Sequence, residues 1–166
     1  MKTLAVVSAL AAIACPSAAW SQTHGDELKA GQYLKTNEWL QAKDGKSFAI
    51  IQRDGNLCVY NGSNPGNKKG EIWCSGKAPG AGDYFLVMQG DANLCVYRGT
   101  GPDDNKGYVW CSAATSRPNG DYRVSLACGG LTVYSLVDAP QGFYIPLPPQ
   151  VIRIWGTKPS KQGFGC

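Results

Sequence analysis

The sequence of 166 residues predicts an all-β fold, and three observations support this prediction. Short apolar runs at 48–51 and 85–88 are bounded by Gly, Asp and Asn, which is typical of strands joined by turns. The pattern around them returns after 37 residues, so the chain contains an internal repeat. Beyond the N-terminal segment, no stretch has a convincing helical period.

Residues 1–21 are predicted to form a signal peptide. A short basic start precedes an apolar run at 4–14 that is too short to span a bilayer. Small residues favour cleavage before Gln22, and cleavage after Ala19 is the alternative. The mature domain then covers 22–166, and we expect it to be secreted, without stable insertion in a membrane.

The cysteine count agrees with export to an oxidising compartment. Seven cysteines are present, and Cys15 falls within the predicted signal segment. A rival interpretation makes residues 12–15 a lipobox, but leucine is usual where Ala12 stands, so a lipid-anchored or periplasmic location is less favoured. Six cysteines remain in the mature chain: Cys58, Cys74, Cys95, Cys111, Cys128 and Cys166.

The composition excludes two classes of protein. Hydrophobic residues make up 43% of the chain and charged residues 17%, which is too apolar a balance for an intrinsically disordered protein. The formal net charge is +4, but the Lys and Arg residues are scattered along the sequence. We therefore expect no nucleic-acid partner.

The repeat is strongest between residues 52–75 and 89–112, where 14 of 24 positions are identical. A further step of 37 residues reaches a third copy that keeps the apolar positions and loses most polar ones. At this offset Phe48, Phe85 and Tyr122 fall in register. The predicted repeats cover about 30–78, 79–115 and 116–157, followed by a tail at 158–166.

Each copy is predicted to contain a hairpin. Residues 54–55 form an Asp-Gly turn signal, and the Asp-Ala pair at 91–92 occupies the same place. After the turn, Asn56, Cys58 and Tyr60 fall on one face of the strand, and the residues between them fall on the other.

Three such units should pack on a shared core, because none can bury its apolar face alone. Trp73, Trp110 and Trp155 follow at related positions in the three copies. A large indole suits a point where three sheets meet, so we expect these side chains at the common axis.

The polar residues of the repeat carry a resemblance to a known family. The pattern Gln-x-Asp-x-Asn-x-x-x-Tyr occurs at 52–60 and 89–97, with Trp-x-Ser after each copy, and resembles the signature of bulb-type (monocot) mannose-binding lectins. The resemblance covers about 27–134 and, more faintly, 154–157. It implies a β-prism II fold, with three four-stranded antiparallel sheets around a pseudo-threefold axis, and recognition of mannose without calcium or a cofactor.

By this resemblance, Asp54 and Asn56 would bind the 2-hydroxyl of mannose, Gln52 the 3-hydroxyl and Tyr60 the 4-hydroxyl. Their counterparts in the second copy are Gln89, Asp91, Asn93 and Tyr97. The chemistry agrees, because sugar hydroxyls donate and accept hydrogen bonds, as these side chains can. Four bonds of about 1 kcal/mol each give roughly millimolar affinity, so useful binding to a glycan or glycoprotein needs several sites.

A purely structural explanation competes with the binding site. Outward polar residues are often only solvated, and Asp or Asn beside a turn bonds its own backbone. However, both copies keep the four polar types while Arg53 is replaced by Gly90 and Gly55 by Ala92. This selective retention favours a ligand site.

Repeat symmetry also predicts the disulfide bonds, because the first two pairs have the same 16-residue spacing. The predicted bonds are Cys58–Cys74, Cys95–Cys111 and, by elimination, Cys128–Cys166. No Cys-x-x-Cys spacing suggests a metal site. The lectin family has Val at the sugar-facing positions of Cys58 and Cys95. This departure keeps open an alternative: a non-sugar-binding adhesion, inhibitor or antimicrobial protein on the same scaffold.

The third copy is predicted to lack a sugar site. At the constant offset, Leu126, Cys128 and Gly130 replace its Gln, Asp and Asn, and only Tyr134 remains of the polar set. The hairpin that follows contains an insertion at 138–149, rich in proline. We interpret it as an ordered loop, with a partner-binding lip as the alternative.

No catalytic residue is predicted. His24 is the only histidine, and glycosidases need two carboxylates about 5 to 10 Å apart where the motif offers one Asp per copy. Residues 61–63 fit a glycosylation sequon or a simple turn. In the family, terminal strands are often exchanged between protomers, which implies a homodimer as one arrangement. A Cys128–Cys166 bond would instead hold the tail on its own chain.

Overall fold

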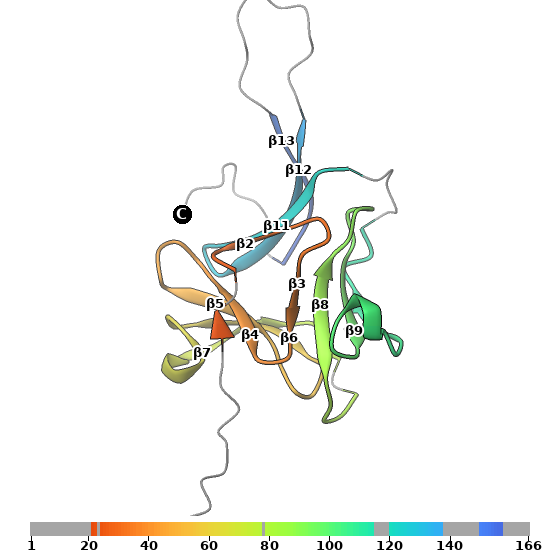
Figure 1. Ribbon diagram of the computed structural model, residues 1–166. Coiled ribbons are helices and arrows are strands. Elements are labelled where there is room, and N and C mark those ends of the chain that lie inside the picture. The colour runs from red at the N-terminus through yellow and green to blue at the C-terminus, as the bar shows by residue number, and fades with distance from the viewer. Residues whose placement is uncertain (1–20, 23, 78, 115–119, 138–149, 158–166) are drawn as a thin grey trace, which may run out of the picture.

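Three β-sheets surround a common apolar core in the computed structural model, which describes residues 21–22, 24–77, 79–114, 120–137 and 150–157 (Figure 1). Each sheet has four antiparallel strands, and the first also carries a two-residue parallel strand at its edge. The described residues contain no α-helix, only two short 3-10 turns. The all-β, three-sheet prediction is confirmed.

The strands are distributed over the sheets as follows. Sheet I contains β1 (Ser21–Gln22), β4 (Glu38–Gln41), β5 (Ser47–Ile51), β6 (Leu57–Asn61) and β7 (Gly70–Cys74). Sheet II contains β3 (Tyr33–Lys35), β8 (Tyr84–Met88), β9 (Leu94–Arg98) and β10 (Tyr108–Cys111). Sheet III contains β2 (Glu27–Lys29), β11 (Tyr122–Ala127), β12 (Gly130–Val137) and β13 (Gln150–Gly156). The 3-10 turns are η1 (Pro65–Asn67) and η2 (Pro102–Asp104).

Three successive short strands supply the fourth strand of three different sheets. Strand β2 pairs with β11, β3 with β8 and β4 with β5. Each places one leucine in the core, and Leu28, Leu34 and Leu40 are all 0% exposed. Sheet membership thus does not follow the order of the sequence repeats, because residues 27–41 supply one strand to each of the three sheets.

The strand faces agree with the alternation of the sequence. Leu57 and Val59 of β6 lie in the central core, where the inner residues of all three sheets meet. Cys58 and Tyr60 point the other way and belong to a separate cluster on the outer face of sheet I. Burial of the inner apolar surface is the main stabilising contribution to such a fold.

Trp73, Trp110 and Trp155 contact one another edge to face, with ring centroids 5.7, 6.0 and 5.8 Å apart. They come from β7, β10 and β13, one strand of each sheet. The predicted contact among the three indole rings is thus confirmed. In each sheet the register shifts beside the tryptophan, as at a β-bulge. The bulge allows two adjacent residues, such as Ile72 and Trp73, both to pack against the core.

The third hairpin is one residue shorter than the other two, which corrects the sequence alignment. Phe48 pairs with Tyr60, but Arg123 pairs with Tyr134. Arg123, and not Tyr122, therefore stands where phenylalanine stands in the other sheets. Ala127 accordingly takes the place of Gln52, where the alignment had put Leu126. An alignment at a constant offset of 37 residues cannot account for a residue that is deleted within a turn.

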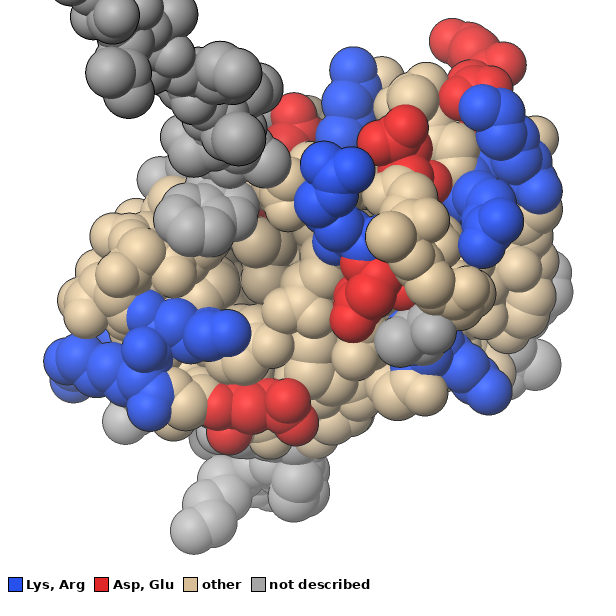
Figure 2. Space-filling view, turned by 90° about the horizontal axis from the view of Figure 1, so that it is seen from below, with Lys and Arg blue, Asp and Glu red and all other residues tan. Residues whose placement is uncertain are grey.

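Several predictions concern residues outside the described part of the chain. These are residues 1–20 of the signal segment, the whole 138–149 insertion, and the tail at 158–166 with Cys166. Cys128 is disulfide-bonded, but its predicted partner is among these residues. Within the described ranges, no helix has the length and apolar character needed to cross a bilayer. On the face shown in Figure 2, basic side chains lie among acidic ones.

Candidate binding site

The turn between β5 and β6 brings together the polar residues of the first copy, which we call site I: Gln52, Asp54, Asn56 and Tyr60. Gln52 N donates to Asn56 O over 3.0 Å, which closes the turn. Gly55 adopts a φ of +84°, a left-handed conformation that glycine takes without penalty. Asp54 Oδ1 accepts from Asn56 N over 2.9 Å. The aspartate thus shapes its own turn with one carboxylate oxygen.

The remaining polar groups of site I are held by side-chain hydrogen bonds. Gln52 Nε2 donates to the Tyr60 hydroxyl over 2.8 Å. The Ser75 hydroxyl donates to Asn56 Oδ1 over 2.7 Å and accepts from Leu57 N. Among the described residues, neither Asp54 Oδ2 nor Asn56 Nδ2 has a hydrogen-bond partner. One acceptor and one donor are therefore oriented and available to a ligand.

The second copy builds the same arrangement on sheet II, which we call site II: Gln89, Asp91, Asn93 and Tyr97. Gln89 Nε2 donates to the Tyr97 hydroxyl over 3.0 Å. Asp91 Oδ1 accepts from Asn93 N over 3.1 Å. One difference is that Asn93 Nδ2 donates to Asp91 Oδ2 over 3.0 Å, so these two groups bond each other. The structure therefore assembles both predicted polar sets, on two separate sheets.

Aromatic rings and a disulfide form the apolar surface beneath each polar set. The rings of Phe48 and Tyr60 stack with centroids 5.5 Å apart, and those of Phe85 and Tyr97 do the same. Trp39 packs edge to face on Phe48 in site I. The outer faces of sheets I and II are thus small apolar clusters and not merely solvated surfaces.

Disulfide bonds join Cys58 to Cys74 and Cys95 to Cys111, the two pairs that the repeat symmetry predicts. Cys58 and Cys95 are only 1% exposed. Their sulfur atoms lie 3.6 and 3.2 Å from the side-chain oxygens of the site glutamines, as contacts rather than hydrogen bonds, because a disulfide has no proton to donate. The disulfides therefore adjoin the polar sets and leave the Gln–Tyr hydrogen bonds intact.

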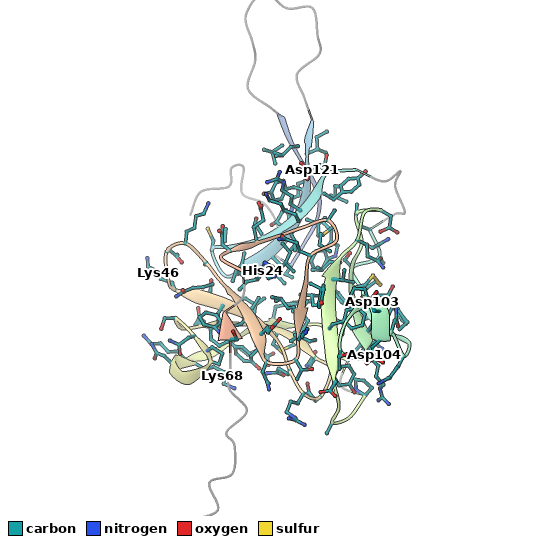
Figure 3. The ribbon with its side chains drawn as sticks, viewed as in Figure 1. His24, Lys46, Lys68, Asp103, Asp104 and Asp121 are labelled. Atoms are coloured by element: carbon teal, nitrogen blue, oxygen red, sulfur yellow. A yellow bond between two sulfur atoms is a disulfide. The ribbon has the colours of Figure 1, made fainter. Side chains whose placement is uncertain are left out.

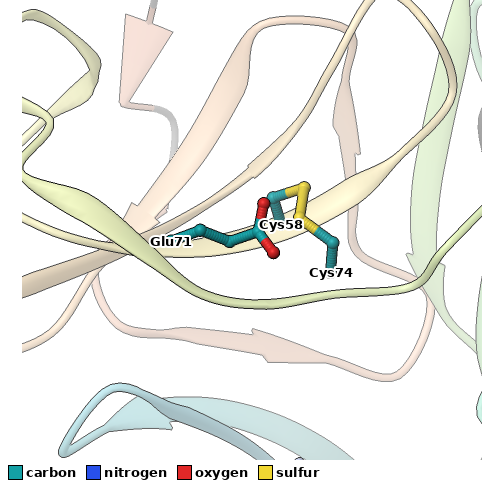
Figure 4. A group of neighbouring side chains, drawn as sticks. All are labelled: Cys58, Glu71 and Cys74. Carbon is teal, nitrogen blue, oxygen red and sulfur yellow. A yellow bond between two sulfur atoms is a disulfide. The ribbon is translucent and has the colours of Figure 1, made fainter.

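Glu71 lies beside the first disulfide, with its carboxylate facing the sulfur atoms (Figure 4). Cys58, Glu71 and Cys74 have their potential ligand atoms within 4.8 Å of one another. Metal binding by cysteine requires thiolates, however, and the two sulfurs are bonded to each other. This cluster is thus not suited to holding a zinc ion.

The outer face of sheet III, which we call the third face, has a different chemistry. Tyr134 donates its hydroxyl proton to the Glu27 carboxylate, and Arg123 forms ion pairs with Glu27 and Asp121 at 3.2 and 3.0 Å. Burial, followed by the hydrogen bond to Glu27, raises the pKa of Tyr134 above its usual value. The hydrogen bond from Arg123 lowers the pKa of the Asp121 carboxyl. The retained tyrosine is therefore engaged in an ionic network.

Solved lectin structures share this architecture. The chain has 27% identity and a TM-score of 0.58 to monomeric monocot mannose-binding lectins from Gastrodia elata, over 83% of this chain and 99% of theirs. It has 28% identity and a TM-score of 0.56 to the mannose-specific agglutinin from snowdrop (Galanthus nivalis) bulbs, complexed with methyl-α-D-mannoside, over 72% and 98%. The chain is a structural relative of the bulb-type mannose-binding lectins. It shares their β-prism II fold.

A third lectin structure, from dutch crocus (Crocus vernus), shares the fold at 23% identity and a TM-score of 0.54, over 70% of this chain and 95% of that one. No protein-family model matches the sequence, and no curated protein matches it significantly. The relationship to the bulb-type lectins is thus evident from the three-dimensional structure.

Within this bulb-type lectin fold, one outward position differs in chemistry between the sheets. The residue paired with the motif tyrosine is Glu71 in sheet I, Tyr108 in sheet II and Arg153 in sheet III. The β-bulge places all three on the outer face, beside the tyrosine. In sheet I, Lys68, which is labelled in Figure 3, also lies over the Tyr60 ring, 4.6 Å from its centroid. Sites I and II therefore have different borders.

Several residues that complete sites I and II were not predicted from the sequence. Ser75 and Ser112 were visible as identical residues of the repeat, and both bond the backbone of the strand that follows the turn. Trp39 and Tyr33 come from short strands that show no counterpart of the 37-residue repeat. The sequence feature that could have revealed these short strands is the regular spacing of Leu28, Leu34 and Leu40. These leucines are six residues apart and lie in short segments of similar pattern.

Proposed function

We propose that the protein is a secreted lectin that binds mannose-type glycans, without calcium and without catalysis, through sites I and II. One observation carries the proposal: the same four side-chain types form the same Gln–Tyr and Asp–Asn hydrogen bonds on two different sheets. Neither set is needed to close the fold, because the third sheet forms without it. Repetition of the arrangement favours a ligand role.

The solved relatives support the choice of ligand. The Gastrodia elata proteins are mannose-binding lectins, and the snowdrop agglutinin was solved with methyl-α-D-mannoside. Each site offers one carboxylate, amide groups and a phenol, which match the donors and acceptors of a hexose. With one carboxylate per site, direct recognition of hydroxyls is a better fit than a calcium-bridged one, since Ca²⁺ takes six to eight oxygen ligands.

Each site alone is expected to bind weakly. About four hydrogen bonds with a net contribution of about 1 kcal/mol each correspond to roughly millimolar affinity. Two sites on different sheets can engage separate branches of one glycan or neighbouring glycans on a surface, and their combined affinity is then much higher. Branched mannose-type glycans are therefore the proposed partners.

The test is a glycan array followed by calorimetric titration of the wild type and the Asp54→Ala plus Asp91→Ala double variant. We expect mannose-dependent binding by the wild type, no change on adding a calcium chelator, and at least a tenfold loss in the double variant. Asp103→Ala is the matched control, because Asp103 is exposed in η2, outside both sites (Figure 3).

Two outcomes would contradict the proposal. Binding that is equal in the wild type and the double variant would show that these sites are not used. A wild type without any mannose-dependent signal would favour the alternative, a non-sugar-binding adhesion, inhibitor or antimicrobial protein. The observation behind that alternative is the disulfide at the positions where the lectin family has Val.

A further inference from the structure

We propose that Tyr108 is an aromatic subsite of site II that receives the second sugar residue of a mannose-type oligosaccharide. The inference rests on the proposed lectin function and adds to it a difference between the two sites. Site II would bind at least a disaccharide, whereas site I would bind a single terminal sugar residue.

Tyr108 is 67% exposed, the highest value among the large hydrophobic residues in the described ranges. It contacts Tyr97 edge to face, with ring centroids 6.4 Å apart and ring planes at 78°. A ring so exposed gains little from packing, and sheets I and III have charged residues at the same position. The fold itself therefore does not require an aromatic side chain here.

Tyr108 lies near the polar set of site II. Tyr97 lies between them: its hydroxyl accepts from Gln89 Nε2 at 3.0 Å, and its ring touches Tyr108. Tyr108 is thus one ring away from the polar groups that would bind a terminal mannose. The next sugar of a chain would extend from that residue over neighbouring surface, and on this side the surface is the ring of Tyr108.

The exposed ring of Tyr108 is chemically complementary to a sugar ring. A pyranose ring has a face of C–H groups, which packs well against the face of an aromatic ring, while its hydroxyls remain in water. Tyrosine combines an apolar ring with a hydroxyl that can remain in water, and it is enriched at interfaces for this reason. A second hexose residue meets both requirements better than an ion or a purely apolar ligand would.

Site I differs in both respects. Glu71 replaces the aromatic ring, and the Lys68 ammonium group lies 4.6 Å from the centroid of the Tyr60 ring. Both charged groups are exposed and hydrated. A second pyranose would have to displace their hydration without gaining an aromatic contact, so site I is expected to show no added affinity for a disaccharide.

The experiment isolates site II in an Asp54→Ala background and compares methyl α-mannoside with the α1,2-, α1,3- and α1,6-linked mannobioses by calorimetric titration. We expect at least one mannobiose to bind about five- to tenfold more tightly than the monosaccharide, the size of an aromatic contact. Tyr108→Ala should abolish this increment and leave monosaccharide binding unchanged, whereas Tyr108→Phe should retain it. Glu71→Ala in the same background is the matched control and should have no effect.

The monosaccharide arm separates the two proposals. If methyl α-mannoside binds and Tyr108→Ala leaves the mannobiose increment unchanged, or if no mannobiose is preferred, the subsite is disproved and the lectin function stands. If site II binds neither the monosaccharide nor any mannobiose, the subsite is disproved together with sugar binding at site II.

Discussion

Ser75 shows how a single residue outside the polar motif can prepare a binding group. Its hydroxyl accepts from the backbone of Leu57 and donates to Asn56 Oδ1, so the amide oxygen of Asn56 is held while its nitrogen has no hydrogen-bond partner among the described residues. In site II, Ser112 accepts from the backbone of Leu94 in the same way, but Asn93 turns toward Asp91. The two sites thus share their residues but not the orientation of the asparagine.

This difference predicts unequal effects of two matched substitutions. Ser75→Ala should weaken mannoside binding at site I several-fold, because the Asn56 amide loses the hydrogen bond that orients it. Ser112→Ala should leave site II affinity unchanged. Both should lower the free energy of unfolding by about 1 kcal/mol, since each removes a hydrogen bond to a backbone N–H. Titration in single-site backgrounds and urea unfolding measure the two effects, and equal losses of affinity would refute the assigned role.

At the scale of the structural element, the hairpin turns decide where the polar residues lie. Gly55 and Ala92 occupy the same turn position, with φ of +84° and +73°. The left-handed conformation is strained for a residue with a Cβ atom, at a cost of about 1 kcal/mol. The third hairpin instead turns through Cys128 and Gly129, both with positive φ, and is one residue shorter. This shorter turn has two residues where each of the other turns has three, and neither of the two is an aspartate.

Exchanging the two turn residues should therefore act in opposite directions. Ala92→Gly should raise the free energy of unfolding by up to about 1 kcal/mol, because it relieves the left-handed strain. Gly55→Ala should lower it by more than that amount. An added Cβ would lie 2.8 Å from the Tyr84 ring and 2.9 Å from Pro79, in addition to the backbone strain. Urea unfolding of both variants provides the comparison, and a stabilising Gly55→Ala would contradict the turn geometry.

Four features could be predicted from the sequence: the hairpins, the strand faces, the contact among the tryptophans and two disulfides. Each of them follows from a local periodicity or from the repeat. The N-terminal strands could not be found in that way. Strand β2 has three residues and pairs with β11, about a hundred residues away, so no local pattern reveals its partner. The polar residues of the sites were predictable by type. Their hydrogen bonds were not, because they depend on the rotation of single side chains.

At the scale of the whole molecule, the three sheets of the pseudo-threefold arrangement differ in the chemistry of their outer faces. Sheets I and II have aromatic clusters and disulfides on their outer faces. Sheet III has Gly156 at the position of the second cysteine, and the Arg153 guanidinium occupies the space beside it. The ionic network of Glu27, Arg123 and Tyr134 thus takes over the place of an apolar cluster.

This network predicts a specific loss of stability at alkaline pH. The pKa of Tyr134 is raised in the folded protein, so above about pH 10, where an unfolded tyrosine ionises, the folded state retains the proton and loses stability as pH increases. Tyr134→Phe should reduce this loss. Urea unfolding between pH 8 and 11 would test it, with Tyr108→Phe, which changes an exposed tyrosine, as the control. A pH dependence identical in wild type and Tyr134→Phe would exclude the network as its source.

The three short strands at the start of the domain also affect how the chain can be made. Strand β2 cannot pair until residues 122–127 exist, and β3 must wait for β8. Sheet I can be completed once residue 74 has been made and sheet II once residue 111 has been made, but strand β13 of sheet III lies at Gln150–Gly156. Strand β2, although made early, therefore belongs to the sheet that stays incomplete until synthesis has nearly ended.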